Sequence, residues 1–254
     1  MKTRVLTAIA IILCVFPPLF FGGWLLEALA VFVVCTSSYE FIHVLLENKR
    51  WEMICTIIMA AWVLGLNFIP EKFLMAYWIC ALIFFWSLPV FTKDINENAG
   101  LSMTAFAMIL GFCYMSIRIL IPNFHYLWTI VFATYGSDTG AYFAGRFFGK
   151  HKMNERVSPK KTWEGFFGGW VFGFILSYAM SFLYVSTLDP TINLAICALA
   201  PVFAELGDLC FSAFKRAHEV KDFSDLLPGH GGILDRIDSL LMNILLFGII
   251  FTIL

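Results

Sequence analysis

The chain has 254 residues, of which 60% are hydrophobic and only 14% are charged, whereas an average soluble domain is about 45–50% apolar and about 25% charged. These values exclude a soluble monomer, and the abundance of apolar residues excludes a disordered chain. A net charge of −1 excludes a basic nucleic-acid-binding protein and the length excludes a small disulfide-stapled module, so we expect an integral membrane protein.

Nine stretches are predicted as membrane spans, because a transmembrane helix needs about 20 mostly apolar residues. In chain order they are 5–21, 23–46, 51–69, 72–92, 101–121, 124–148, 163–187, 190–214 and 233–254. Little of the chain is left for loops, so we predict an all-α, polytopic protein with one membrane-embedded domain over residues 1–254. Residues 1–130 are almost purely apolar and are expected to form a scaffold half, whereas residues 131–254 carry the polar motifs.

The first stretch also has features of a signal peptide, because Lys2 and Arg4 precede an apolar run. The segment 16–20, Phe-Pro-Pro-Leu-Phe, offers no small-residue cleavage site. A retained first helix is therefore favoured.

The orientation follows from the basic residues. With nine spans, fifteen of the 17 Lys and Arg residues fall on the side of the N-terminus, and only Lys72 and Arg118 fall on the other. The positive-inside rule then predicts a cytoplasmic N-terminus and a site that faces the cytoplasm.

Ionisable side chains inside spans cost at least a few kcal/mol each unless they face water or a partner, so each is a functional candidate. Three sets have the spacing of one helix face. They are Asp138, Tyr142 and Arg146 in the sixth span, Glu205, Asp208, Ser212 and Lys215 in the eighth, and Asp235, Asp238 and Ser239 in the ninth. We expect their carboxylates to converge in the cytoplasmic half of the bundle.

Clustered carboxylates repel one another unless a cation or basic side chains neutralise them. The seven cysteines fall in apolar stretches without a CxxC pair, and no His has ligand spacing. Oxygen ligands alone favour Mg²⁺ over zinc, so we expect a Mg²⁺ site. The alternative is a set of structural salt bridges with Arg146, Lys215, Arg216 and Arg236.

The connection 221–232 combines glycines with basic side chains. Gly229, Gly231 and Gly232 allow a ligand to approach the backbone amides, as phosphate-binding loops require. Together with the nearby lysines, arginines and carboxylates, they indicate a Mg²⁺–phosphate substrate. We expect His230, which lies between two of these glycines, to contact phosphate.

A second basic segment is Ser158-Pro159-Lys160-Lys161-Thr162. We expect Ser158 to cap the seventh span and Pro159 to be its first helical residue, which would place both lysines in the first turn. Lysines there oppose the helix dipole unless an anion binds, so Lys160 and Lys161 are candidate phosphate ligands. Ordinary positive-inside anchoring is the alternative.

Small residues recur every four positions at Gly136, Gly140 and Ala144, and again at Gly165, Gly169 and Gly173. Such faces allow two helices to approach closely. We expect this packing within the chain, with dimerisation as the alternative.

The segment 212–238 resembles the signature of the phosphatidate cytidylyltransferase (CDP-diacylglycerol synthase) family. The matching residues are Ser212-Ala213-Phe214-Lys215-Arg216, Lys221-Asp222-Phe223-Ser224 and Leu227-Pro228-Gly229-His230-Gly231-Gly232-Ile233-Leu234-Asp235-Arg236-Ile237-Asp238. Residues 137–150 and 158–165 are similar to further motifs of that family, so the resemblance covers about the C-terminal half of the chain.

The resemblance implies an enzyme that converts CTP and phosphatidate to CDP-diacylglycerol and pyrophosphate with Mg²⁺, leaving open a second cation. It also implies an all-helical homodimer in the cell membrane. By position, the catalytic residues would be Asp208, Lys215, Asp235 and Asp238, and the metal ligands Asp138, Asp208, Asp235 and Asp238. The substrate ligands would be Lys160, Lys161, Ser212, Arg216, Lys221, His230, Gly231, Gly232 and Arg236.

Two other functions fit a membrane protein with clustered acids. A CDP-alcohol phosphotransferase has an Asp, two further residues and then Asp-Gly, whereas Asp138 is followed by Thr139-Gly140. An ion-coupled transporter would use the acids as a cation site, but such proteins commonly contain repeated halves, and none is evident here.

Overall fold

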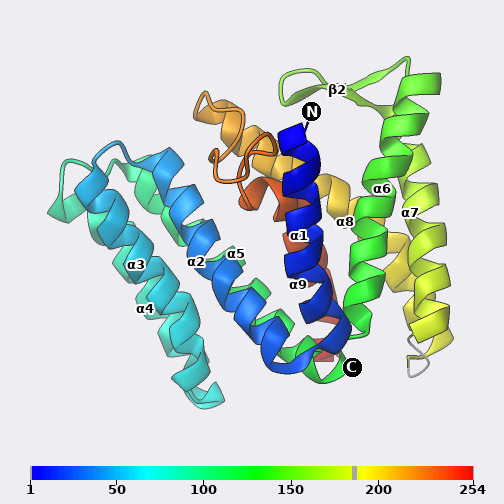
Figure 1. The fold of residues 1–254 in the computed structure, drawn as a ribbon. Helices are drawn as coiled ribbons and strands as arrows, with labels where there is room; N and C mark the ends of the chain where they lie inside the picture. The colour runs from blue at the N-terminus through cyan, green and yellow to red at the C-terminus, as the bar shows by residue number, and fades with distance from the viewer. Residues whose placement is uncertain (1, 185–187, 254) are drawn as a thin grey trace.

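The computed structural model describes residues 2–184 and 188–253, which form nine α-helices and one two-stranded β-hairpin (Figure 1). The helices are α1 (Lys2–Phe21), α2 (Gly23–Leu45), α3 (Lys49–Gly65), α4 (Leu74–Phe91), α5 (Glu97–Leu120), α6 (Tyr126–Phe148), α7 (Trp163–Tyr184), α8 (Pro190–Ala217) and α9 (Leu234–Ile253). Short 3₁₀ turns are η1 (Leu66–Phe68), η2 (Glu71–Phe73) and η3 (Ile121–Asn123), and the strands are β1 (Lys152–Asn154) and β2 (Ser158–Thr162). Each predicted span coincides with one helix, although residues 185–187 and 254 lie outside the described residues.

Seven of these helices, α2 to α5 and α7 to α9, are long and apolar enough to cross a membrane. The chain is therefore a multi-pass membrane protein. The apolar run of α1 is shorter, Leu6–Phe21, and α6 carries polar side chains such as Asp138 and Arg146 along its length.

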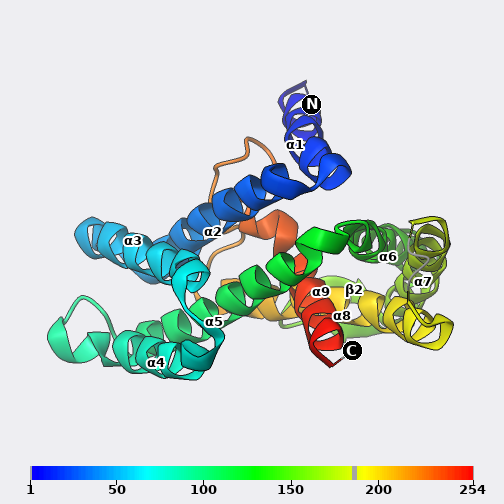
Figure 2. The same ribbon diagram turned by 90° about the horizontal axis from the view of Figure 1, so that it is seen from below.

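The helices form a broad layer rather than a closed ring. Figure 2 shows α3 and α4 on one side, α6 and α7 on the other, and α5, α8 and α9 between them. Helix α1 lies at the edge of this layer, where it contacts α2. The two termini lie at opposite ends of the bundle, and the hairpin and the connection between α8 and α9 lie at the N-terminal end (Figure 1).

The predicted all-α fold class is supported by the nine helices, but the hairpin corrects the prediction that the seventh helix begins at Pro159. Ser158 and Pro159 belong to β2, which pairs antiparallel with β1. A residue before proline is pushed out of the helical region, so Ser158 is extended. The cap is Thr162 instead: its Oγ1 accepts a hydrogen bond from the Gly165 amide at 3.1 Å, and α7 begins at Trp163.

Helices α6 and α7 pack through their small residues, which confirms the predicted packing within the chain. A Cβ added to Gly169 would lie 2.7 Å from the Ser137 carbonyl oxygen, and one added to Gly173 would lie 2.9 Å from that of Ala133. Such distances leave no room for a side chain. The close contact fixes α6, which carries Asp138, against the helix that follows the hairpin.

An aromatic stack joins the N-terminal helices to the signature region. The ring centroids of Phe41 in α2 and Phe106 in α5 are 3.8 Å apart, and Phe41 also stacks on Phe214 of α8 at 4.6 Å. Phe223, in the connection between α8 and α9, is only 1% exposed and stacks on Phe214 at 5.8 Å. Burial of this ring anchors one end of that connection in the core.

Candidate active site

The hairpin brings Lys161 to the acidic face of α8. Its Nζ atom lies 2.7 Å from Glu205 Oε1 and also contacts Asp208 Oδ2. Burial alone would lower the pKa of the Lys161 ammonium group, but the carboxylates of Asp208 and Glu205 outweigh this effect, so the pKa is raised. Lys161 therefore places a permanent positive charge at these acids, and it does so from a strand rather than from the predicted helix turn.

Lys215 makes a second bridge, from α8 to α9. Its Nζ atom donates to Asp235 Oδ1 at 2.7 Å and lies 3.7 Å from Asp238 Oδ2. The Lys215 side chain is only 9% exposed, so this pairing is shielded from solvent. Lys215 thus forms the structural salt bridge that the sequence offered as the alternative to a metal site.

The other basic residues named in that alternative have different partners. Arg146 donates to the Tyr142 hydroxyl at 2.7 Å, and Arg216 donates to the Val220 carbonyl at 2.8 Å. Both side chains are exposed.

Asp235 holds the loop between α8 and α9 in addition to binding Lys215. Its Oδ2 atom accepts hydrogen bonds from the Phe223 amide at 2.8 Å and from the Gly232 amide at 2.9 Å. Both carboxylate oxygens are therefore engaged by the protein, and the side chain is 1% exposed. The sequence spacing gave no sign of this second role.

Glu40 is a site residue that the sequence reasoning missed. It lies in α2, in the predicted scaffold half, and is completely buried. Its carboxylate accepts hydrogen bonds from the Ser224 hydroxyl at 2.6 Å, the Ile233 amide at 2.9 Å and the Leu234 amide at 2.6 Å. A charged residue within the predicted span 23–46 was the signal that could have identified it.

The remaining acids surround the end of α8. Asp138 on α6 is exposed and close enough to Asp208, Lys161 and Glu205 to interact with their charges. Asp208 also accepts a hydrogen bond from the Ser212 hydroxyl at 3.2 Å. Acids from α6, α8 and α9 thus lie close to one another, and two lysines lie among them.

These acids suit a hard cation that arrives with its own oxygen ligands. Within residues 2–184 and 188–253, no three His, Cys, Asp or Glu side chains lie close enough to form a complete metal cage. Mg²⁺ commonly uses one or two carboxylates together with substrate phosphates, so a complete cage is not required. Solvent reaches the Asp208 and Asp138 side chains, so these two fit this donor set better than Asp235, whose side chain is only 1% exposed.

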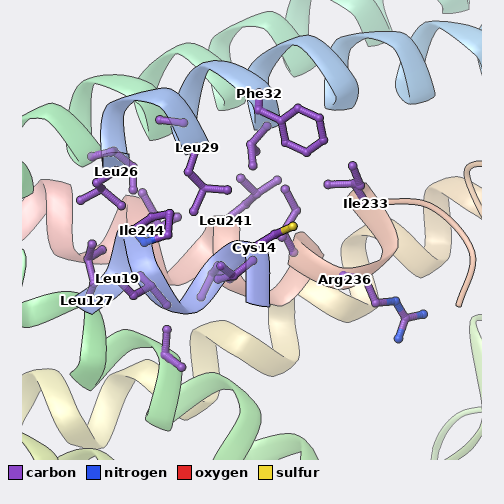
Figure 3. Close-up of a pocket in the computed structure, with 18 of the residues that line it drawn as sticks. Cys14, Leu19, Leu26, Leu29, Phe32, Leu127, Ile233, Arg236, Leu241 and Ile244 are labelled. Atoms are coloured by element: carbon purple, nitrogen blue, oxygen red, sulfur yellow. The ribbon is translucent and has the colours of Figure 1, made fainter. Parts of the chain in front are cut away.

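Two cavities meet at Arg236. A polar pocket of about 270 Å³ is lined by Lys221, Asp222, Asp225, Gly229, His230, Gly231 and Arg236. An almost wholly apolar cavity of about 630 Å³ lies between α1, α2, α5, α6 and α9. Figure 3 shows the Arg236 side chain at one end of this cavity, with its guanidinium group directed away from Leu29, Leu241 and the other aliphatic side chains.

The predicted substrate ligands are thus partly gathered. Four of them, Lys221, His230, Gly231 and Arg236, line the polar pocket. Lys161 and Ser212 lie instead at Asp208, and Lys160 is exposed on β2. Gly232 is buried against Glu40.

Comparison with known proteins extends the similarity beyond these motifs. A model of the cytidylyltransferase family matches residues 2–254. A protein of Staphylococcus haemolyticus named phosphatidate cytidylyltransferase is 34% identical over 264 aligned positions, which cover 97% of this chain and 99% of the relative. A protein of the same name from Staphylococcus aureus (strain COL) is 33% identical, with the same coverage. One from Haemophilus influenzae is 37% identical over 65% of this chain and 62% of the relative.

Proposed function

The chain belongs to the cytidylyltransferase family, and on that premise we propose that it transfers the cytidylyl group of CTP to phosphatidate. The products are CDP-diacylglycerol and pyrophosphate. The observation that carries this proposal is the position of Arg236, which lines both the apolar cavity and the polar pocket. A lipid tail and a phosphate-bearing substrate can therefore meet at one side chain. The relatives' shared name favours this reaction over phosphotransfer from CDP-lipids and over ion transport.

In this reaction a phosphate oxygen of phosphatidate attacks the α-phosphorus of CTP. The new bond joins that oxygen to phosphorus, the bond between the α-phosphorus and its bridging oxygen to the β-phosphate breaks, and pyrophosphate leaves. A phosphate monoester is largely dianionic at neutral pH, so no protein base is needed to activate it. The protein contributes position and charge stabilisation.

We assign Mg²⁺ to the acids around Asp208, with Asp138 and Asp238 as further ligands, and leave open a second cation. When bound, the cation neutralises charge on the triphosphate. The acidic excess supports this assignment, since five carboxyl groups face only two ammonium groups. The carboxyl groups are those of Asp138, Glu205, Asp208, Asp235 and Asp238, and the ammonium groups are those of Lys161 and Lys215.

In this proposal the basic residues bind different phosphate groups. Lys161 and Lys215 hold the acids together before substrate binds and then face the phosphates. His230, the amides of Gly231 and Gly232, Lys221 and Arg216 orient the nucleotide phosphates from the loop side. Arg236 binds the phosphate of the lipid at the mouth of the apolar cavity.

The apolar cavity would take an acyl chain of phosphatidate. Its volume of about 630 Å³ lies within the roughly 300–1,000 Å³ typical of ligand pockets. Its aliphatic walls cannot satisfy a polar ligand. An acyl chain held there would place the lipid phosphate beside Arg236.

The chain would cross the cell membrane nine times, with its N-terminus and active site on the cytoplasmic side. The opposite ends of the termini in Figure 1 and the clustering of basic residues toward the N-terminal end support this topology. A homodimer is the remaining part of the proposal, and it depends on the family resemblance.

A transfer assay with purified protein tests this function. CTP labelled at the α-phosphorus, phosphatidate in neutral detergent micelles and Mg²⁺ should give organic-soluble label and an equal amount of pyrophosphate. No label should move when phosphatidate is omitted. Failure of the complete mixture to transfer label would contradict the proposal.

A further inference from the structure

We propose that Glu40 is a positioning residue, which holds the loop 221–233 in its active shape from the opposite half of the chain. The inference rests on the proposed function for its kinetic consequence. Its structural part, a buried carboxylate that clamps the loop, stands on contacts alone. Asp235, within the signature segment, holds the same loop from α9, and Glu40 adds a second hold from α2.

The clamp consists of three hydrogen bonds across more than 180 residues of sequence. Oε1 of Glu40 accepts from the Ser224 hydroxyl at 2.6 Å and from the Ile233 amide at 2.9 Å, and Oε2 accepts from the Leu234 amide at 2.6 Å. Ser224 lies near the start of the loop, and Ile233 and Leu234 lie at its end. One carboxylate therefore ties both ends of the loop to α2.

The charge of Glu40 is balanced by backbone groups. Its side chain is fully buried, and it forms no ion pair with any of the described residues. The amides of Ile233 and Leu234 are the unpaired donors at the start of α9, where the helix dipole favours a negative charge. Glu40 thus caps α9 from another helix.

The close approach also explains the glycine at position 232. A Cβ added there would lie 2.6 Å from Oε1 of Glu40, so no other residue fits without moving the carboxylate. The Gly232 amide points the other way and donates to Asp235. The loop is therefore held between two buried carboxylates, one from α2 and one from α9.

The hydrogen bonds from Glu40 and Asp235 also fix the residues that line the polar pocket. Gly231 and His230, which line the pocket, immediately precede the clamped segment, and Arg236 follows it by two residues. Without Glu40, only Asp235 would fix the end of the loop. We expect the pocket then to lose its order while the helices stay packed.

Glu40→Gln tests the clamp with little change in volume. The amide nitrogen must replace either Oε2, where it faces the Leu234 N–H, or Oε1, where it faces the Ile233 N–H. Either orientation sets two donors against each other. Ser224→Ala removes only one of the three hydrogen bonds. Glu52→Gln is the matched control, because Glu52 is a buried carboxylate of the same half that pairs with His43 at 3.0 Å, away from the loop.

Two measurements are made on full-length protein in neutral detergent. Hydrogen exchange should become at least ten-fold faster in peptides covering 222–234 for Glu40→Gln, with α3 and α4 unchanged. In the transfer assay, kcat/KM for CTP should fall at least ten-fold. Ser224→Ala should show both effects to a smaller degree, and Glu52→Gln neither. If the Gln variant does not insert, Ser224→Ala decides the matter alone.

Unchanged loop exchange in both variants would overturn the clamp. Faster exchange with unchanged kinetics would show that the clamp exists but does not position the reaction, which also overturns the proposal. Equal losses in Glu52→Gln would reduce Glu40 to a general stabilising residue. If the wild-type protein fails to transfer label, the proposed function is contradicted. The hydrogen-exchange measurements then still test whether Glu40 holds the loop.

Discussion

Lys161 and Lys215 divide the acidic side chains into two groups at the scale of single residues. Lys161 pairs with Glu205 and Asp208 from the hairpin, and Lys215 pairs with Asp235 from within α8. Asp235 is fully engaged by Lys215 and two amides and is 1% exposed, whereas the Asp208 side chain is 31% exposed. The two aspartates should therefore respond differently to substitution.

Asp208→Asn should abolish most turnover while the protein still folds and inserts. The loss should be about 100-fold in kcat, or about 2.7 kcal/mol of transition-state stabilisation, because the substitution removes charge from the cation site. Rates measured against Mg²⁺ concentration check this. Asp189→Asn is the control, since Asp189 caps α8 far along the same helix and Asn caps equally well. Wild-type rate and Mg²⁺ dependence in Asp208→Asn would refute the assignment.

Asp235→Asn should also be inactive, but it should be less stable than Asp208→Asn. Its amide group would face the Lys215 ammonium group or the amides of Phe223 and Gly232, which are all donors. Comparing the melting temperatures of the two variants separates the roles. Equal melting temperatures would show that Asp235 has no structural duty.

Lys161→Gln should lower kcat/KM at least ten-fold, and more than Lys160→Gln, because only Lys161 contacts the acids at Asp208. The Lys161 pKa is raised, so its ion pairs stabilise the fold fully below the unfolded-state pKa of about 10.4 and are lost as pH rises through the folded pKa. The deficit should therefore be constant between pH 7 and pH 9. Steady-state kinetics in neutral detergent provide the test.

Lys93→Gln is the control for loss of a basic surface residue, because Lys93 is exposed in the turn between α4 and α5. A deficit of equal size in Lys93→Gln would return Lys161 to the role of a positive-inside anchor.

Helical spacing predicted which residues share a face, but it did not predict their partners. Glu205, Asp208 and Ser212 do lie together, as their spacing required. The partner of Glu205 and Asp208 comes from a strand 44 and 47 residues earlier, counting from Lys161. Glu40 was missed for the same reason, since contacts between distant segments depend on tertiary packing that periodicity does not encode.

At the scale of elements, helix α2 contributes to the site in two ways. Leu26, Leu29 and Phe32 on its first half line the apolar cavity, and Glu40 on its second half holds the loop (Figure 3). The spans of the N-terminal half were predictable from hydropathy alone, since each coincides with a helix. Their part in the site was not, because an apolar lining has the same composition as a lipid-facing surface.

Leu29→Trp should raise KM for phosphatidate about five-fold or more and leave KM for CTP unchanged. The larger side chain would fill space that the proposed acyl chain needs, without reaching the polar pocket. Kinetics at varied phosphatidate in mixed micelles check the first value. Ile57→Trp on α3, where Ile57 is exposed, serves as the control. A matching rise in KM for CTP would contradict a separate lipid cavity.

The whole molecule should have an odd number of crossings. Reporters fused after residue 254 and inserted in the hairpin at 155–157 should report opposite compartments, with the hairpin on the cytoplasmic side. The arrangement of both termini in Figure 1 and the distribution of Lys and Arg give the same expectation. The same compartment for both reporters would contradict nine spans.

The clamp between Glu40 and the start of α9 also constrains how the protein is made. Leu234 is synthesised 194 residues after Glu40, which at roughly 5–20 residues per second is a wait of roughly 10–40 s. The first of its native hydrogen-bond donors, Ser224, is itself synthesised 184 residues after Glu40, and an unpaired acidic side chain at the centre of a membrane helix costs about 2.5–3.5 kcal/mol by insertion measurements. Helix α2 therefore acquires its native contacts with the loop only after α8 and the loop have been synthesised.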